Sequence, residues 1–235
     1  MKKIATIVSA LMLVSAVSAF ASGPGPFYAP GDYVSPNWTP GDPSCALSLS
    51  AGVWSGNVAA SVGAGTYGAK VAVAGWSESY PNSNVSVFLT GPGEIVKWTF
   101  DTNTYADGWL PATDIVLSDH AYPAGITWEV IGAAPETGGW SSGVAMSKSG
   151  SVWSATINIA SAGSYDVKFR KTGDWSLNIG SDGVGTNSNN FNYTTTLPNQ
   201  PVTFQFNEAT GRSRIVVGGV TGTSSRTWGQ VKTAK

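Results

Sequence analysis

The 235-residue sequence contains one cysteine, Cys45, and one histidine, His120. A single cysteine excludes an intramolecular disulfide, so the fold must be stabilised by its hydrophobic core. We expect Cys45 to be a small buried apolar residue and His120 to lie exposed in a linker. The sequence shows no Ser/His/Asp set, no cluster of metal ligands and no phosphate-binding loop, so it predicts neither a metal nor another cofactor.

Charged residues are also few: 13 Lys and Arg stand against 14 Asp and Glu, together 11% of the chain. Nucleic acids and anionic membranes are captured by clustered basic residues, so neither is expected as a partner. A glycosidase needs two carboxylates held together in a cleft. Here the acidic residues are scattered through predicted turns and strand ends, and we expect a protein that is not an enzyme.

Long apolar runs are missing after the N-terminus. Residues 1–3 are basic at two of three positions, residues 4–17 are mostly apolar, and Ala19 and Ala21 are the small residues of a signal-peptidase site. Residues 1–21 are therefore predicted to be a cleaved signal peptide of bacterial type. No later run approaches the roughly 20 apolar residues that a membrane span requires. The sequence predicts a secreted protein, extracellular or periplasmic.

What the chain does have is alternation. Apolar and polar residues alternate in "YGAKVAVAG", "IVKWTFD", "VWSATINIA", "YDVKFRK" and "VTFQFN", and each run is bounded by Gly, Pro, Asn or Asp. This period-2 pattern, rich in β-branched and aromatic residues, predicts strands. Helical periodicity is missing outside residues 1–21, so the fold is predicted to be all-β.

The pattern also repeats. Matching residues lie 98 to 106 positions apart, which predicts two homologous modules. The matched pairs are Trp38 with Trp140, Trp54 with Trp153, Tyr67 with Tyr165, Lys70 with Lys168, Trp76 with Trp175, Phe100 with Phe206, and Thr104 with Thr210. The predicted order is a β-sandwich module at 22–119 with a Pro-rich N-terminal arm, a linker at 120–125, a second module at 126–219 and a flexible tail at 220–235. Each module has the size of a small immunoglobulin-like β-sandwich.

The order of short motifs carries a resemblance. The first repeat contains "NWTPGDPS", "AGVW", "GTYGAK", "AGWSESYPNS" and "FDTNT", and the second contains "GGW", "GSVW", "GSYDVK", "GDWS" and "FNEATG". This order resembles the accessory β-sandwich modules of bacterial pullulanases and of starch-surface-binding proteins. The resemblance covers nearly all of the predicted mature chain. It implies two tandem immunoglobulin-like modules that bind carbohydrate and perform no catalysis, with a neutral polysaccharide such as starch or another α-glucan as the partner.

Aromatic residues are the natural contacts for such a partner. Period 2 places Tyr67 and Val71 toward the core and Lys70 on the opposite face of its strand; in the second module Lys168 and Arg170 are likewise predicted to point outward. An indole ring covers the C–H face of a pyranose, and an ammonium group donates to its hydroxyls. The carbohydrate-binding candidates are Trp38, Lys70, Trp76, Tyr80, Trp140, Lys168 and Trp175.

Two alternatives stay open. Some of the ten tryptophans must belong to the core, and Trp54, Trp98 and Trp153 have the strand positions expected of buried residues. The second repeat also lacks an aromatic counterpart of Tyr80. The low charge and the Gly, Ser, Thr and Asn content suit a structural subunit as well, in a filament, surface layer or biofilm matrix. Its partners would be copies of itself, held by the Pro-rich N-terminal arm.

The predicted signal peptide has a direct test. Export with cleavage after Ala21 gives a mature chain that begins at Ser22. Intact-mass measurement of the protein recovered from a bacterial host's periplasm or medium checks this. A recovered chain that keeps residues 1–21 would contradict it.

Overall fold

The computed structural model describes residues 24–185 and 189–219, and these residues confirm the all-β prediction. The predicted signal peptide, 1–21, and the predicted flexible tail, 220–235, lie outside the described residues. The helical segments that are described are three-residue 3-10 turns. None of the helices in this part of the chain is long and apolar enough to cross a membrane.

Residues 27–118 form two antiparallel sheets, ordered β1-β4-β5 and β2-β3-β6-β7. Their strands are β1 (Phe27–Tyr28), β2 (Ser48–Ser50), β3 (Val53–Ala59), β4 (Gly65–Val73), β5 (Ser79–Leu89), β6 (Ile95–Asp101) and β7 (Ile115–Ser118). The 3-10 turns are η1 (Pro43–Cys45) and η2 (Ala74–Trp76). We call this half of the chain the first unit.

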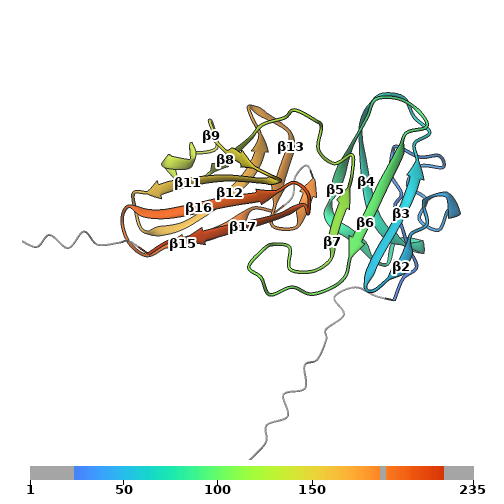
Figure 1. Ribbon diagram of the computed structural model, residues 1–235, viewed down its shortest axis with the longest axis horizontal. Helices are drawn as coiled ribbons and strands as arrows, with labels where there is room; N and C mark the ends of the chain where they lie inside the picture. Colours follow the sequence, from blue (N-terminus) through green and yellow to red (C-terminus); the bar gives the residue numbers. More distant parts are fainter. Residues whose placement is uncertain (1–23, 186–188, 220–235) are drawn as a thin grey trace, which may run out of the picture.

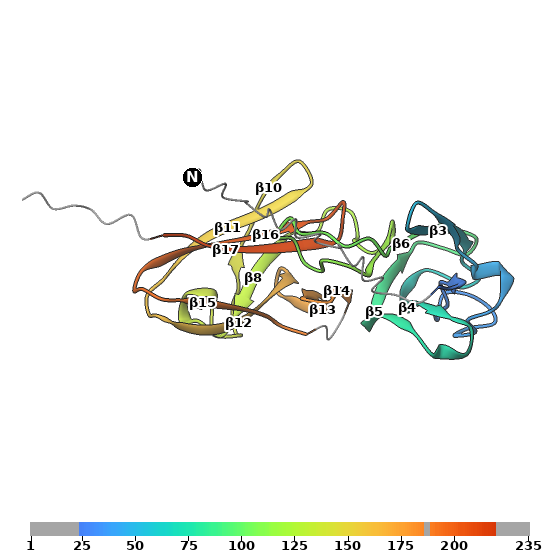
Figure 2. The ribbon, with the colours of Figure 1, turned by 90° about the horizontal axis from the view of Figure 1, so that it is seen from below.

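Residues 128–217, the second unit, repeat the plan with sheets ordered β10-β11-β16-β17 and β14-β13-β12-β8-β9, and β15 also pairs with β12. The elements are β8 (Trp128–Gly132), η3 (Pro135–Thr137), β9 (Val144–Ala145), β10 (Ser147–Ser149), β11 (Val152–Ile159), β12 (Gly163–Lys171), β13 (Asp174–Gly180), β14 (Gly183–Gly185), β15 (Phe191–Thr195), β16 (Gln200–Asn207) and β17 (Arg212–Val217). The two units follow one another along the long axis of the molecule (Figure 1, Figure 2).

Each unit has its own core, and each core takes side chains from both of its sheets. Trp98 is fully buried, as the sequence predicted, Phe204 is fully buried in the second core, and Cys45 is buried as expected. Trp54 is paired with Phe100 between β3 and β6. The matched residues Trp153 and Phe206 are paired in the same way between β11 and β16. The sequence repeat is therefore a repeat of strand register.

The repeated Gly-Thr/Ser-Tyr motif also has a structural cause. The Tyr67 hydroxyl donates a hydrogen bond to the carbonyl oxygen of Gly63 at 3.0 Å. The tyrosine side chain lies so close to the start of its own strand that a Cβ on Gly65 would be 3.0 Å from the hydroxyl oxygen. The Tyr165 hydroxyl donates to the Ser161 carbonyl at 3.1 Å. The glycine leaves room for this side chain in both units.

A clamp joins the units. The loop between β6 and β7 reaches to β17 (Figure 1), where the amides and carbonyls of Leu110 and Ser213 exchange hydrogen bonds of 2.7 and 2.8 Å. Beside them the Arg212 guanidinium donates to both carboxylate oxygens of Asp107, each at 2.8 Å, and to the carbonyl of Trp109 at 2.9 Å. The loop of the first unit thus covers the free edge of β17, an edge that would otherwise expose unpaired backbone groups.

The predicted linker, 120–125, is packed rather than loose. Phe88 donates its amide to the carbonyl of His120 at 3.0 Å, and Tyr122 packs against both cores. The prediction that His120 is exposed is wrong, because its side chain is only 24% exposed. Its ring nitrogens lie 2.6 Å from an Asp119 oxygen and 3.3 Å from a Glu94 oxygen, so two carboxylates hold the ring against the protein.

The clamp has a testable consequence. We expect Arg212→Ala to loosen the two units, seen as a larger maximum dimension in small-angle X-ray scattering. The Lys171→Ala variant, which removes an ion pair with Asp174 inside the second unit, is the control and should scatter as the wild type does. Unchanged scattering of Arg212→Ala would contradict the role of the clamp.

The clamp should also withstand acid. Hydrogen bonds from Arg212 lower the pKa of the Asp107 carboxyl to about 2. A lowered carboxyl pKa means that the ion pair is fully present above the unfolded-state pKa of about 4 and is lost only as the pH falls through about 2. The wild-type scattering curve should therefore be the same at about pH 5 as at about pH 7. Separation of folded units in this range would be evidence against the ion pair.

Candidate functional site

Two pairs of tryptophans stand out among the candidates. Trp38 and Trp76 form the first tryptophan pair, with ring centroids 6.0 Å apart and planes tilted by 39°. Trp140 and Trp175 form the second tryptophan pair, at 6.3 Å and 36°. Trp76 is 40% exposed and Trp175 is 44% exposed. Four of the seven predicted site residues are thus brought together in two equivalent pairs, one on each unit.

The entry loop of the first unit positions Trp38. Gly31 approaches β4 so closely that a Cβ on it would lie 2.5 Å from the carbonyl oxygen of Gly68. That carbonyl accepts the Asp32 amide at 2.9 Å, and the Gly31 carbonyl accepts the Trp38 amide at 3.3 Å. Trp38 itself is in the left-handed region with φ of 48°. The backbone contact therefore fixes where the loop leaves the strand and where the indole is presented.

The second unit uses the same construction. A Cβ on Gly132 would lie 2.5 Å from the carbonyl oxygen of Asp166. That carbonyl accepts the Ala133 amide at 2.8 Å, the Gly132 carbonyl accepts the Trp140 amide at 3.0 Å, and Trp140 has φ of 66°. The positions of Trp38 and Trp140 are therefore specified by equivalent backbone contacts.

The second member of each pair comes from the hairpin that follows. Trp76 ends η2, where Gly75 and Trp76 have φ of 80° and 64°, a tight left-handed turn between β4 and β5. Trp175 lies near the start of β13. Arg170 places its guanidinium 4.4 Å from the Trp175 ring centroid, and Glu129 accepts from Arg170 Nε at 2.6 Å. One face of Trp175 is thus supported by a cation that is already paired.

A carboxylate and an asparagine border the first tryptophan pair. Asp32 accepts a hydrogen bond from Trp38 Nε1 at 2.5 Å. A Cβ on Gly68 would lie 2.9 Å from Asn84 Nδ2, 3.4 Å from an Asp32 oxygen and 3.5 Å from the Trp38 ring. Asp32, Asn84 and Trp38 therefore gather over the bare backbone of Gly68. Hydrogen-bonding groups lie beside the aromatic ring.

The second unit carries a carboxylate at the matching strand position. Asp166 replaces Gly68, and its two oxygens accept from Asn192 Nδ2 at 3.0 Å and Asn190 Nδ2 at 3.4 Å. Ala133 stands where the first unit has Asp32. These acids were not among the predicted site residues, because scattered carboxylates are typical of turns. Their positions beside the repeated Gly-x-Tyr motif and the entry loop were the available signal.

Lys70 and Lys168 are not the free donors beside the tryptophans that the sequence had predicted. Lys70 Nζ donates to the carbonyls of Pro81 and Asn82, each at 2.6 Å. Lys168 is buried, at 8% exposure, and donates to Asn178 Oδ1 at 3.0 Å. Desolvation by burial lowers the pKa of both ammonium groups. Both lysines bond to groups of the protein itself rather than standing beside the tryptophans as free donors.

Arg170 is also buried, at 5% exposure, so the solvent exposure expected of the outward-pointing Lys168 and Arg170 is wrong. Alternation puts them opposite the core, but that second face of the sheet is covered too. Glu129 and Ile131, on the neighbouring strand β8, are buried at 5% and 0%. Period 2 predicts the face of a strand and cannot tell whether that face is covered.

Tyr80 does not take part in either pair. Its ring stacks on Phe100, with centroids 5.0 Å apart and planes at 27°, and packs against the core of the first unit. Tyr80 is paired across the sheet with Val71, which is fully buried. Directly opposed residues share a face of a sheet, so Tyr80 must point inward. Tyr80 is thus partly buried against the core, apart from both tryptophan pairs, and its role in sugar stacking stays a prediction.

A scan against protein-family models and a search of curated proteins each find no match to this chain. Within the described ranges, no group of three or more His, Cys, Asp or Glu is arranged to hold a metal ion. The two tryptophan pairs, with Asp32 and Asn84 beside the first, are the features on which a function can be based.

Substitution of a paired tryptophan should lower the free energy of unfolding less than substitution of a core tryptophan. We expect Trp98→Ala to lower the free energy of unfolding by about 3–5 kcal/mol, because it empties a fully buried site. Trp76→Ala should lower it by less than about 1 kcal/mol. Chemical denaturation followed by circular dichroism measures both. A loss for Trp76→Ala as large as that for Trp98→Ala would assign the ring to the fold and not to a surface site.

Proposed function

We propose that this protein is a secreted, non-catalytic carbohydrate-binding protein of a bacterium, and that its partner is a neutral polysaccharide such as an α-glucan. The observation that carries the proposal is the repeated pair of tilted, partly exposed tryptophans, Trp38 with Trp76 and Trp140 with Trp175. An isolated exposed aromatic is common on protein surfaces. Two such pairs built by equivalent backbone contacts suggest a ligand.

The chemistry around the pairs suits a sugar. The faces of the indole rings match the C–H face of a pyranose, and carboxylate and carboxamide groups accept from and donate to hydroxyls. Asp32 and Asn84 supply these groups at the first pair, and in the second unit Asp166, bonded to Asn190, occupies the strand position that matches Gly68. The nearby cation Arg170 is neutralised by Glu129. The sites thus favour a neutral partner, and they use no metal or cofactor.

The proposed architecture is that of two immunoglobulin-like sandwiches, like the accessory modules of bacterial pullulanases and starch-surface-binding proteins. Support comes from the two antiparallel sheets of each unit and from the single core that draws on both. Antiparallel sheets packed face to face over one core are the basis of such sandwiches.

Tandem sites would raise the affinity for a polymer. When one pair is bound, the other meets the same chain at a high effective concentration, which can increase overall affinity by roughly 10²–10⁴ without new contacts. The clamp between Arg212 and Asp107 fixes the relative position of the units. A polysaccharide with many identical rings can bridge such fixed sites, whereas a monosaccharide cannot.

Affinity gel electrophoresis tests the proposal. The mature protein should be retarded in gels that contain glycogen or amylopectin. Trp76→Ala and Trp175→Ala should each weaken binding about 10-fold or more, because each removes roughly 1.5 kcal/mol or more of aromatic burial. The double variant should lose most retardation.

Leu197→Ala is the matched control, since Leu197 is 48% exposed and lies in the turn before β16, outside both tryptophan pairs. It should migrate as the wild type does. Absence of retardation with every glycan tested would refute the proposal. Ordered polymers of the protein alone, with the tryptophan pairs at the contacts, would support the alternative of a structural subunit.

A further inference from the structure

A groove runs between the two units, away from the tryptophan pairs. It consists of two hollows of about 520 and 420 Å³. Ala209, in the turn between β16 and β17, lines both of them, so the hollows are neighbours at this residue. Each volume falls within the roughly 300–1,000 Å³ that is usual for ligand sites.

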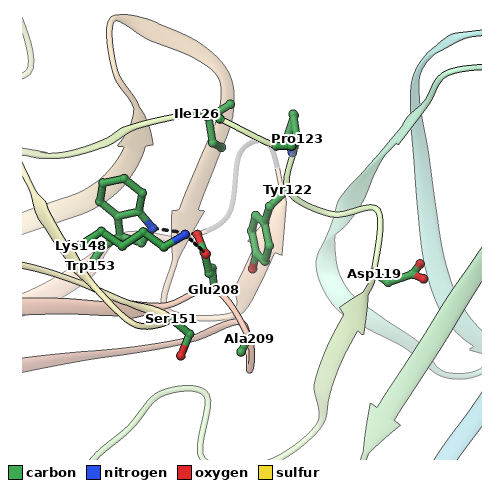
Figure 3. A pocket seen from close by; sticks show the side chains of 11 residues that line it. Asp119, Tyr122, Pro123, Ile126, Lys148, Ser151, Trp153, Glu208 and Ala209 are labelled. Carbon is green, nitrogen blue, oxygen red and sulfur yellow. Dashed lines mark hydrogen bonds and ion pairs between the residues drawn. The ribbon is translucent and has the colours of Figure 1, made fainter.

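The larger hollow lies beside the predicted linker (Figure 3). Lys148 forms an ion pair with Glu208, and its ammonium nitrogen lies 5.4 Å from the Trp153 ring centroid. Glu208 also accepts from Trp153 Nε1 at 2.8 Å. Tyr122, from the linker, lies on the other side of Glu208 in this view (Figure 3). Aromatic rings and a fully paired charge therefore line this part of the groove.

The smaller hollow lies between the sheet of the first unit and the turn of the second. Its walls include Tyr105, which is 37% exposed and donates its hydroxyl to Asp101 at 2.7 Å. The Arg212 guanidinium lies 4.9 Å from the Tyr105 ring centroid. Leu117 adds an apolar surface and Thr210 adds a hydroxyl. The lining combines an aromatic ring with hydroxyl and carboxylate groups.

The cations along the groove are paired within the protein, whereas the carboxylates of Asp101 and Asp119 accept from neutral donors or lie beside a histidine. Lys148 is neutralised by Glu208, and Arg212 by Asp107. Asp101 accepts hydrogen bonds from Tyr105 and from Asn103. An anionic ligand would have to compete with Glu208 and Asp107 for the two cations, whereas a neutral hydroxylated ligand can donate hydrogen bonds to the carboxylates.

We propose that a chain of a neutral polysaccharide lies in this groove across Ala209, as a binding site separate from the tryptophan pairs. The proposal rests on the proposed function, since it takes the same class of ligand. The groove exists only where the two units meet, and the clamp fixes its walls before any ligand arrives, which lowers the ordering cost of binding.

The groove is not a copy of something in the first unit. Trp54 matches Trp153 in strand position, but there the N-terminal segment covers the ring: a Cβ on Gly25 would lie 2.5 Å from Trp54 Cζ2. Trp153 is similarly buried, at 7% exposure, but it is Lys148 that lies over its ring, and both residues border the larger hollow. Duplication of one binding module therefore does not account for this groove, because its walls come from both units.

Filling the groove tests the proposal. Ala209 is exposed, so Ala209→Trp should fold, and its side chain would block the place where the hollows are neighbours. In the Trp76→Ala/Trp175→Ala background, titration calorimetry with maltoheptaose should show an affinity at least about tenfold lower when Ala209→Trp is added, and no change when Ala209→Ser is added. The Trp76→Ala/Trp175→Ala double variant should keep measurable maltoheptaose binding, while Ala209→Trp should stay retarded in glycogen gels.

A second measurement uses the unaltered protein. Maltoheptaose should slow hydrogen exchange of the backbone amides at residues 208–211. Equal maltoheptaose affinity for Ala209→Trp and Ala209→Ser in the double-variant background, or unchanged exchange at 208–211, would show that the groove is not a binding site. The proposed function would still stand if the wild type is retarded in glycogen gels. A wild type that is neither retarded by glycogen nor binds maltoheptaose would overturn both.

Discussion

The placement of Trp38 and Trp140 on the surface depends on a close approach between two backbone segments, which occurs once in each unit. At Gly31 a glycine lies so near the Gly68 carbonyl that no side chain could fit, and Gly132 repeats the contact against Asp166. Each contact begins the entry loop of its unit and fixes the glycine carbonyl that accepts the backbone amide of Trp38 or, in the second unit, of Trp140. A glycine permits this approach because it lacks Cβ. The indoles are thus set by the backbone rather than by their own packing.

The aromatic residues of this protein fall into two groups, buried core rings and partly exposed paired rings. Core rings such as Trp98 supply the burial on which a chain without a disulfide must rely. The paired rings keep a substantial part of their surface exposed, at 40% for Trp76 and 44% for Trp175. Because the clamp at Arg212 and Asp107 joins the units, the two pairs and the groove between the units form one fixed arrangement of aromatic and neutral polar surfaces.

The sequence was sufficient for the all-β class and for the matched positions, because alternation and repeated register are properties of single strands. It was not sufficient for contacts between distant segments. Tyr80 points inward because an irregularity in the pairing of β4 with β5 sets it opposite Val71, a register that alternation cannot reveal. Lys168 is buried because a second face of its sheet is covered. The contact of Trp38 with Trp76 joins a loop to a hairpin, and the spacing between them in the sequence carried no sign of it.

The most direct test of the central claim is a nuclear magnetic resonance titration with maltoheptaose, read at the indole N–H resonances. The resonances of Trp38, Trp76, Trp140 and Trp175 should shift with rising ligand concentration, while that of the core residue Trp98 stays in place. If the four paired indoles stay unchanged while the protein binds the glycan, the tryptophan pairs are not the binding sites and the claim is contradicted.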